Sequence, residues 1–245
     1  MKAKTDIQWQ ERVTQNTQAS ETSYETLSIL TVDVVVLTLD EWRLKVLLHQ
    51  RPNEPFAGAW ALPGGFVHLN EDDDTSAAIE RVLAHKVGVG GIYMEQLKTY
   101  SGMGRDPRGW SLSVAHIALV PRKDLHLPDS PAVALIDVDD LPELAFDHVE
   151  IIKDALGRLR SKGAYSTLPA NFLDREFTLS DLQAAYESVL GEKLDTSAFR
   201  RKVSDLEFLE KTGETRGGSS KRPARLYRLH DPFRLFDRTL GRSNS

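Results

Sequence analysis

Residues 60–89 read WALPGGFVHLNEDDDTSAAIERVLAHKVGV, and this strand–loop–helix pattern anchors the first half of the chain. Pro63-Gly64-Gly65 breaks a short strand, because proline lacks a backbone donor and glycine favours turns. Four carboxylates, Glu71 to Asp74, then stand where they complement the dipole of a helix predicted over residues 75–87. Gly88 supplies the C-cap of that helix.

Apolar segments on either side of this pattern predict strands. The β-branched run from Ile29 to Leu39 is too short for a membrane helix and predicts a buried strand, followed by a turn at Asp40-Glu41. Further strands are predicted over residues 44–49, 93–100, 111–121 and 133–137. Strands and a helix in this order indicate a mixed α/β domain over residues 26–145.

Composition limits the class of protein. The 245 residues include 36 acidic and 31 basic side chains, for a net charge of -5, and 40% are hydrophobic, as in soluble globular proteins. The absence of cysteine excludes disulfides, thiolate metal sites and cysteine nucleophiles. No apolar run reaches the ~20 residues needed to span a bilayer, and the first residues lack the apolar core of a signal peptide. We therefore expect a cytoplasmic protein without membrane contact, with a flexible polar arm over residues 1–25.

The pattern changes after residue 145. Residues 148–160 form a helix with an apolar stripe that Gly163 stops, and we interpret residues 146–163 as a linker helix. Residues 164–245 then read as two helices followed by strand, glycine-rich basic loop and strand, which predicts a winged helix-turn-helix domain. The first of these helices ends at Gly191. Their candidate N-caps are Thr178 or Ser180 for the first and Asp195 or Thr196 for the second.

Basic residues gather in this second region. Residues 146–245 carry a net charge of +3, whereas the first 145 residues carry -8. Between Lys211 and Arg228 six basic residues face the single acid Glu214. Such a cluster indicates a polyanionic partner, although a solvated surface loop has the same composition.

The segment from Leu62 to Val67, the acids after it, Arg81 and Gly88-Val89 together resemble the signature of the Nudix hydrolases. The resemblance covers residues 28 to 145 and implies a loop-helix-loop whose glutamates hold Mg²⁺ against a nucleoside diphosphate. Consecutive carboxylates suit this task because they supply the oxygen ligands of hard cations.

The paired glutamates of that signature are missing in both registers that the chain allows. Counting forward from Gly65 places Leu83 and Ala84 at the pair. Counting backward from Gly88, with a two-residue insertion among the acids, keeps Arg81 and places His85 and Lys86 there. We prefer the second register and expect no hydrolase activity and no metal site, since an ammonium repels Mg²⁺. Weak cation binding by the acids, or a softer metal on His85, are the alternatives.

A Nudix fold without its catalytic carboxylates can still bind the nucleotide. Arg105-Asp-Pro-Arg108-Gly lies in a glycine-rich loop between strands and resembles a segment of Nudix proteins that handle ADP-ribose-like compounds, and of related regulators. Guanidinium groups match phosphate oxygens, and aromatic rings stack on bases. Position in the fold gives the candidate ligand-binding residues Arg51, Phe56, Trp60, Gly65, Phe66, Arg81 and Arg105. Trp60 and Phe66 can equally be core residues, and Arg81 can serve an internal salt bridge.

The complete architecture resembles the Nudix-related transcriptional regulators of NAD metabolism. The C-terminal match rests on Phe177-Thr178-Leu179, Tyr186, Phe199-Arg200-Arg201-Lys202, Gly213-Glu214 and the segment from Arg222 to Arg228. The resemblance implies a homodimer on a palindromic operator in double-stranded DNA, with ADP-ribose or a related nucleotide as effector and no required cofactor. One helix face and the basic loop supply the candidate DNA contacts Thr196, Ser197, Arg200, Arg201, Lys202, Arg216, Lys221, Arg222 and Arg225.

We therefore expect an α/β protein in which a Nudix-like mixed α/β/α domain precedes a winged helix-turn-helix domain. Its expected function is a ligand-responsive repressor of NAD-metabolism genes. The alternative is an active ADP-ribose pyrophosphatase with an appended DNA-binding or assembly domain, which the missing glutamates disfavour. A protein-interaction module would leave the basic hairpin unexplained.

Overall fold

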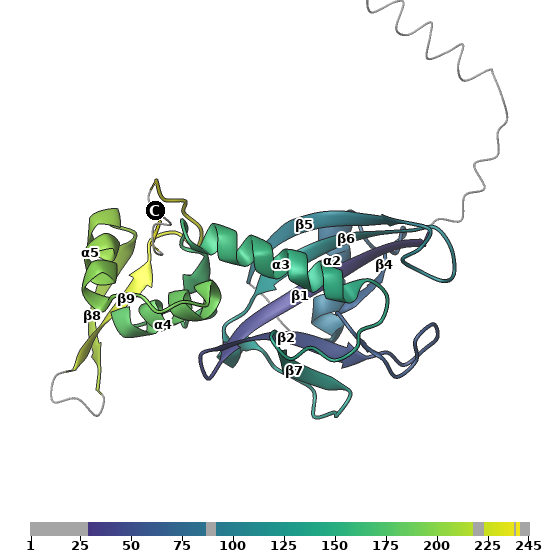
Figure 1. Cartoon of the computed structure of the whole chain (residues 1–245), viewed down its shortest axis with the longest axis horizontal. Helices are drawn as coiled ribbons and strands as arrows, with labels where there is room; N and C mark the ends of the chain where they lie inside the picture. Colours follow the sequence, from purple (N-terminus) through teal and green to yellow (C-terminus); the bar gives the residue numbers. More distant parts are fainter. Residues whose placement is uncertain (1–28, 87–91, 218–222, 238, 241–245) are drawn as a thin grey trace, which may run out of the picture.

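The computed structural model describes residues 29–86, 92–217, 223–237 and 239–240. A long helix lies on the sheet domain, and its C-terminal end reaches a smaller helical domain (Figure 1). The predicted arm over residues 1–25, the predicted C-cap Gly88 and the tip of the basic loop lie outside the described residues. Among the helices that the structure describes, none is long and apolar enough to span a bilayer.

A mixed sheet organises the first domain around its longest strand, β1 (Ile29–Asp40). β1 pairs in parallel with β6 (Ser111–Leu119) and antiparallel with β2 (Arg43–Gln50). The strand order is β3-β2-β1-β6-β5, while β4 pairs with β1 and β7 with β2. The other strands are β3 (Trp60–Ala61), β4 (Gly64–Phe66), β5 (Tyr93–Gly102) and β7 (Val133–Asp137).

One helix covers each face of this sheet because β1 is apolar on both sides. Val32, Val34 and Val36 pack with Ala78, Ile79, Val82 and Leu83 of α2 (Thr75–Lys86). Val35 and Leu37 point to the other face, where α3 (His148–Gly163) contributes Ile151, Ile152, Ala155 and Leu159. The predicted α/β/α layering follows from this alternation.

The second domain is a winged helix. A short 3-10 helix, η2 (Leu168–Phe172), precedes α4 (Leu179–Leu190) and α5 (Thr196–Leu206), and the wing consists of β8 (Leu209–Arg216) and β9 (Ala224–Leu229). Thr178 and Asp181 form a capping box at the start of α4, Gly191 ends it with a φ of 71°, and Asp195 caps α5. Of the paired candidates for N-caps, Thr178 and Asp195 therefore fill the role.

The C-terminal segment closes this domain in a way that the sequence did not predict. Phe236 and Leu240 are buried, and their backbone N–H groups donate to the carbonyls of Tyr165 and Ala164. The helix predicted over residues 148–160 runs to Gly163, where the sequence predicted that it stops, and its C-cap Ala164 has the right-handed helical conformation. Packing also favours glycine at position 163, since a Cβ there would lie 3.0 Å from Val189 Cγ1.

Candidate functional site

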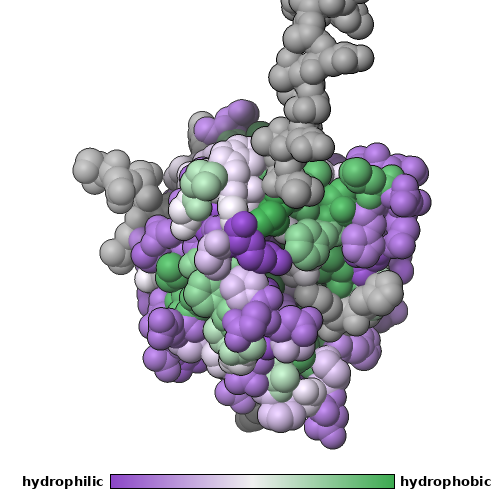
Figure 2. Space-filling model, turned by 90° about the vertical axis from the view of Figure 1, so that its right-hand side faces the viewer, coloured by the Kyte–Doolittle hydropathy of each residue, from purple (hydrophilic) through white to green (hydrophobic). Residues whose placement is uncertain are grey.

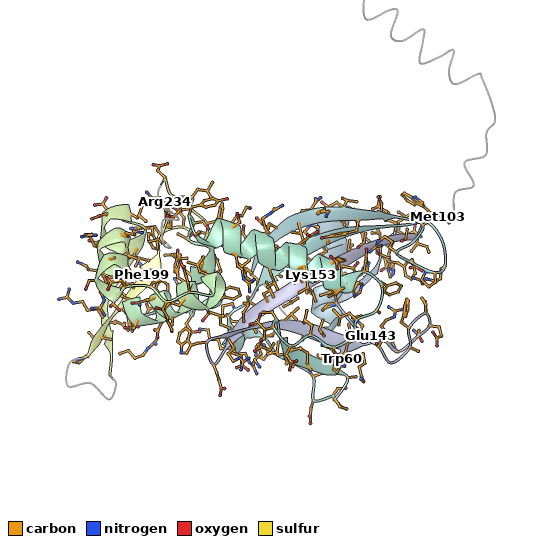
Figure 3. The ribbon with its side chains drawn as sticks, viewed as in Figure 1. Trp60, Met103, Glu143, Lys153, Phe199 and Arg234 are labelled. Carbon is orange, nitrogen blue, oxygen red and sulfur yellow. The ribbon has the colours of Figure 1, made fainter. Side chains whose placement is uncertain are left out.

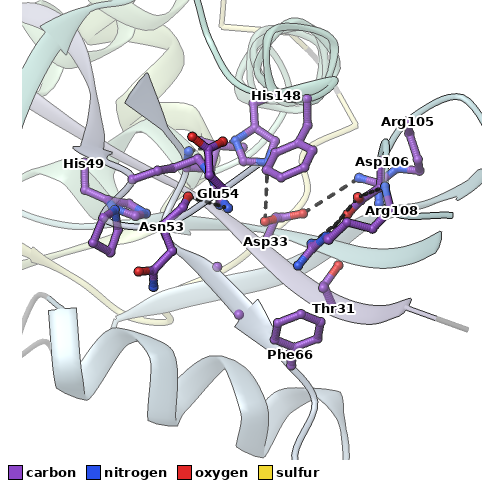
Figure 4. A pocket seen from close by; sticks show the side chains of 16 residues that line it. Thr31, Asp33, His49, Asn53, Glu54, Phe66, Arg105, Asp106, Arg108 and His148 are labelled. Atoms are coloured by element: carbon purple, nitrogen blue, oxygen red, sulfur yellow. Dashed lines mark hydrogen bonds and ion pairs between the residues drawn. The ribbon is translucent and has the colours of Figure 1, made fainter. Parts of the chain in front are cut away.

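A cavity of ≈ 330 Å³ opens where β1, β2 and β4 meet the β5–β6 loop and the first residue of α3 (Figure 4). It is rich in charge for its size. Its lining includes Thr31, Asp33, His49, Arg51, Asn53, Glu54, Gly65, Phe66, Arg105, Asp106, Arg108, Phe146 and His148.

Three arginines enter the cavity, each held by a neighbour. Arg105 donates from Nε and Nη2 to both carboxylate oxygens of Asp147, at 2.9 and 2.8 Å, and is only 11% exposed. Arg108 pairs with Asp106 at 2.7 Å and lies 5.2 Å from the centre of the Phe66 ring. Three guanidinium groups around one cavity suit phosphate oxygens, which they can bind in pairs of parallel hydrogen bonds.

The floor of the cavity carries a buried carboxylate and a buried imidazole. Asp33 accepts a 2.6 Å hydrogen bond from Ser113 Oγ, and its other oxygen lies 3.6 Å from Nε2 of His148. Burial lowers the pKa of His148, which accepts at Nδ1 from the Leu62 N–H, so the ring is neutral. Glycine is required at Gly64, since a Cβ there would lie 2.2 Å from Asp33 Oδ1.

Two aromatic residues in the region of the cavity have a left-handed backbone conformation. Phe56 and Phe146 have φ angles of 64° and 55°, and their rings meet edge to face at 4.9 Å between centres. The Arg51 guanidinium lies 4.7 Å from the centre of the Phe146 ring. Left-handed conformations at bulky residues cost energy and concentrate at ligand sites.

The structure brings most of the expected ligand residues to this cavity. Arg51, Gly65, Phe66 and Arg105 line it, whereas Phe56 does not line it but contacts Phe146, which does. Trp60 does not line it; the ring packs against the sheet core, while the carbonyl accepts from the Ala145 N–H.

Arg81 also lies away from the cavity. Its guanidinium donates to both carboxylate oxygens of Asp72, at 2.8 and 2.6 Å, and to the carbonyl of Phe66. This ion pair ties α2 to the preceding loop. The alternative of an internal salt bridge therefore describes its position.

Sequence reasoning missed Asp33, Phe146 and His148. A charged residue inside the apolar run of β1 was a usable signal for Asp33, because an acid is rarely buried without a partner. Nothing in the local pattern marked Phe146 or His148, which reach the cavity only because α3 begins beside β1.

The residues around α2 do not fit a magnesium centre. The helix itself carries one carboxylate, the exposed Glu80. Before it, Asp72 is bound to Arg81, and Asp74 accepts from the Ala77 N–H as the helix cap. Among the described residues no three histidines, aspartates or glutamates are grouped so that they could hold a metal ion.

A second surface is formed by α5, which packs against the domain through one face and carries exposed cations. Phe199 (Figure 3) and Val203 of α5 are buried, and the Phe199 ring lies edge to face with that of Tyr186 on α4. Arg200 and Arg201 are exposed on the opposite side. Of the remaining candidates on α5, Thr196 and Ser197 are exposed and Lys202 is half-buried. A helix of this kind can enter the major groove of DNA.

The wing contributes further cations. Arg225 on β9 is exposed. Arg216 on β8 is committed to Asp181 of the α4 capping box, at 2.9 Å, and to the Glu176 carbonyl. The candidates Lys221 and Arg222 lie outside the described residues.

Comparison with known proteins matches both halves of this arrangement. The model of the NUDIX domain matches residues 28–155, and the model of the NrtR DNA-binding winged helix domain matches residues 169–229. An ADPR responsive transcriptional repressor of Acinetobacter baylyi, NtrR, is 39% identical over 206 residues, which cover 82% of this chain and 82% of that protein. An ADP-ribose pyrophosphatase of Methanocaldococcus jannaschii is 40% identical over 111 residues, 45% of this chain and 64% of that enzyme.

Solved structures extend the likeness. Shewanella oneidensis NrtR, crystallised with a 27mer DNA, is 38% identical with a TM-score of 0.81, over 87% of this chain and 100% of that one. The NUDIX domain of the same protein, crystallised with ADP ribose, is 36% identical with a TM-score of 0.52, over 60% of this chain and 97% of that one.

Proposed function

The chain belongs to the family of Nudix-domain regulators with an NrtR winged helix, and from this premise we propose that it is a DNA-binding transcriptional repressor whose operator affinity responds to a nucleotide. The observation that carries the proposal is the union, in one chain, of an arginine-lined cavity and an exposed basic helix. An enzyme would need the first and not the second.

The effector that suits the cavity best is ADP-ribose or a close relative. Its diphosphate matches Arg51, Arg105 and Arg108, and its ribose hydroxyls match the acceptors on the floor. The same ligand occurs in two relatives: the Acinetobacter repressor is ADPR responsive, and the Shewanella NUDIX domain was crystallised with ADP ribose. We propose genes of NAD metabolism as its targets and the cytoplasm as its location.

We also propose that the Nudix domain does not hydrolyse its ligand and requires no cofactor. Two of the four carboxylates before α2, Asp74 and Asp72, are engaged in a helix cap and an ion pair, and the helix adds only Glu80. Without a metal, the diphosphate would lose several kcal/mol of transition-state stabilisation. The similarity to the Methanocaldococcus pyrophosphatase favours hydrolysis as the alternative.

An electrophoretic shift with genomic fragments, repeated with ADP-ribose, tests the regulatory role. We expect retention of a specific fragment and a change in its affinity with ADP-ribose. Arg51→Ala should weaken the response to ADP-ribose, whereas Arg160→Ala, an exposed arginine on α3, should leave it intact. No specific fragment, or an affinity indifferent to saturating nucleotide, would refute the role.

Incubation of the protein with ADP-ribose and Mg²⁺ tests the catalytic part. We expect no AMP above the background of a protein-free sample. Steady AMP release that EDTA abolishes would make the protein an enzyme and favour the alternative.

A further inference from the structure

The N-terminus of α3 forms part of the cavity wall. His148, the first residue of this helix, is buried in the floor, where it accepts from the Leu62 N–H. Asp147, the N-cap, precedes it and binds the Arg105 guanidinium. A change in the hydrogen-bond partners of Arg105 therefore also changes those of Asp147 at the start of α3.

Asp147 does not perform the usual task of an aspartate at this position. An N-cap aspartate normally accepts a hydrogen bond from the first turn of its own helix, and Asp195 does so for α5 at 2.8 Å. The Asp147 side chain makes no such bond, because both of its oxygens accept from Arg105. This carboxylate thus has two alternative partners, the Arg105 guanidinium and the first-turn N–H groups of its helix, of which that of Glu150 now donates to the Asp147 carbonyl at 3.0 Å.

Arg105 likewise has two alternative partners. Its Nε and Nη2 donors are used by Asp147, its Nη1 donates to Ser111 Oγ at 3.3 Å, and Asp33 lies 3.9 Å away. A phosphate group in the cavity needs the same donors in the same paired geometry. Arg105 therefore cannot make paired hydrogen bonds to a phosphate and to Asp147 at the same time.

The far end of α3 touches the winged helix. Gly163 packs against Val189 of α4, and Leu159 shares one apolar core with Val189 and Phe172. Near this end, Lys162 and Arg158 are both paired with Glu95 of β5. These contacts join the C-terminal end of α3 to both β5 and the winged helix.

We propose that Asp147 is the positioning residue that couples the cavity to the DNA-binding domain. An anionic effector takes Arg105 from Asp147, the carboxylate turns to cap α3, and the helix shifts against α4. This inference rests on the proposed function, because it needs a nucleotide effector and an operator.

The test compares Asp147→Asn with Glu150→Gln, a matched loss of charge in the same helical turn, where the exposed Glu150 pairs with Lys153. Operator affinity is measured with and without saturating ADP-ribose, and the ratio of the two affinities is the coupling. We expect about 5- to 150-fold coupling in the native chain and in Glu150→Gln, but about onefold in Asp147→Asn. Asp147→Asn should also bind ADP-ribose about 10-fold more tightly, since its competitor for Arg105 is weakened.

Native coupling in a folded Asp147→Asn variant would overturn the inference and leave the proposed function standing. A native chain that binds no operator or no ADP-ribose would overturn the proposed function itself. Asp147→Glu, which keeps the carboxylate, should retain most of the coupling.

A measurement in the native background covers the case in which Asp147→Asn does not fold. Because the chain has no cysteine, nitroxide labels can be placed at Glu80→Cys on α2 and Lys153→Cys on α3, both exposed positions on opposite sides of the sheet. ADP-ribose should shift the distance distribution between the labels. Identical distributions with and without it would also overturn the inference.

Discussion

Arg81 illustrates at the scale of one residue what sequence alone leaves open. A guanidinium attracts phosphates and carboxylates alike, so its pattern fits a ligand role and a structural role equally. The choice depends on Asp72, whose side chain is only 1% exposed beneath it. That geometry follows from the path of the loop before α2.

Arg81→Gln should destabilise the fold without weakening ADP-ribose binding. The hydrogen bond from Arg81 lowers the pKa of Asp72 from 3.8 to about 2. Because the folded-state pKa is the lower one, the pair stabilises the fold above pH 3.8 and loses this contribution as the pH falls through about 2. Thermal melts from pH 7 to pH 2 should show a deficit in the variant that shrinks at the acid end. A constant deficit, or lost ADP-ribose affinity in calorimetry, would contradict this role.

Only some of the residues that line the cavity could be predicted from the sequence. Arg105 was predictable because arginines in a glycine-rich loop signal phosphate binding, and Arg51 because of its position in the Nudix-like fold. Phe146 and His148 were not, since their role comes from the contact of α3 with β1, more than a hundred residues away in the chain. Long-range packing of this kind leaves no local pattern.

At the scale of the element, α5 was easier to predict from the sequence than the wing. Its apolar and basic residues separate on opposite faces, so periodicity alone orients it. The wing was less predictable, because Arg216 looks like a DNA contact yet is bound to Asp181. Sequence places a cation on a strand but does not identify its partner.

Arg200→Ala and Arg201→Ala should each weaken operator binding, because both side chains project from the exposed face of α5. Each lost phosphate contact should reduce the slope of log affinity against log salt by about one unit, and each lost base contact should cost about 1–3 kcal/mol. Fluorescence anisotropy at several salt concentrations measures both effects, with Arg160→Ala on α3 as control. Native affinity in both variants would place the DNA-binding surface elsewhere.

Lys221→Ala and Arg222→Ala test the tip of the wing, for which we retain the expectation from sequence. Each should flatten the salt dependence by about one unit if it meets a phosphate. Arg216→Ala serves as the comparison and should lower the melting temperature as well, because it removes the ion pair with Asp181. Salt slopes equal to that of the native chain would leave the tip without a role in DNA binding.

At the scale of the whole molecule, a palindromic operator requires two winged helices related by a two-fold axis. We expect a homodimer held by the Nudix domains, because all the large exposed apolar side chains of the described residues except Leu235 lie there. The end of the sheet domain shows apolar surface interspersed with hydrophilic surface (Figure 2), and the exposed Met103 lies at this end (Figure 3). Sedimentation should give about twice 27.5 kDa. A monomer at operator-binding concentrations would refute it.

One apolar core runs through both domains, which predicts that they unfold together. Val35 and Leu37 of β1, Leu159 of α3, and Phe172 and Val189 of the winged helix belong to the same buried cluster. In addition, Ser188 Oγ of α4 donates to the Trp42 carbonyl in the β1–β2 turn at 2.6 Å, and Lys123 pairs with Asp174. Separating the domains would expose this core to water, at about 25 cal/mol per Å² of apolar surface.

Two probes can follow the domains separately during unfolding in urea. Trp42, Trp60 and Trp110 lie in the Nudix domain, so their fluorescence reports on it, and Val203→Cys adds a single buried thiol to the winged helix of a chain without cysteine. Both transitions should share one midpoint. Leu159→Ala should shift the two midpoints equally, by a loss of about 2–5 kcal/mol, because its side chain belongs to the shared core. A thiol that becomes reactive well before the tryptophans respond would mean that the winged helix unfolds alone, and the shared core would then not bind the two domains into one cooperative unit.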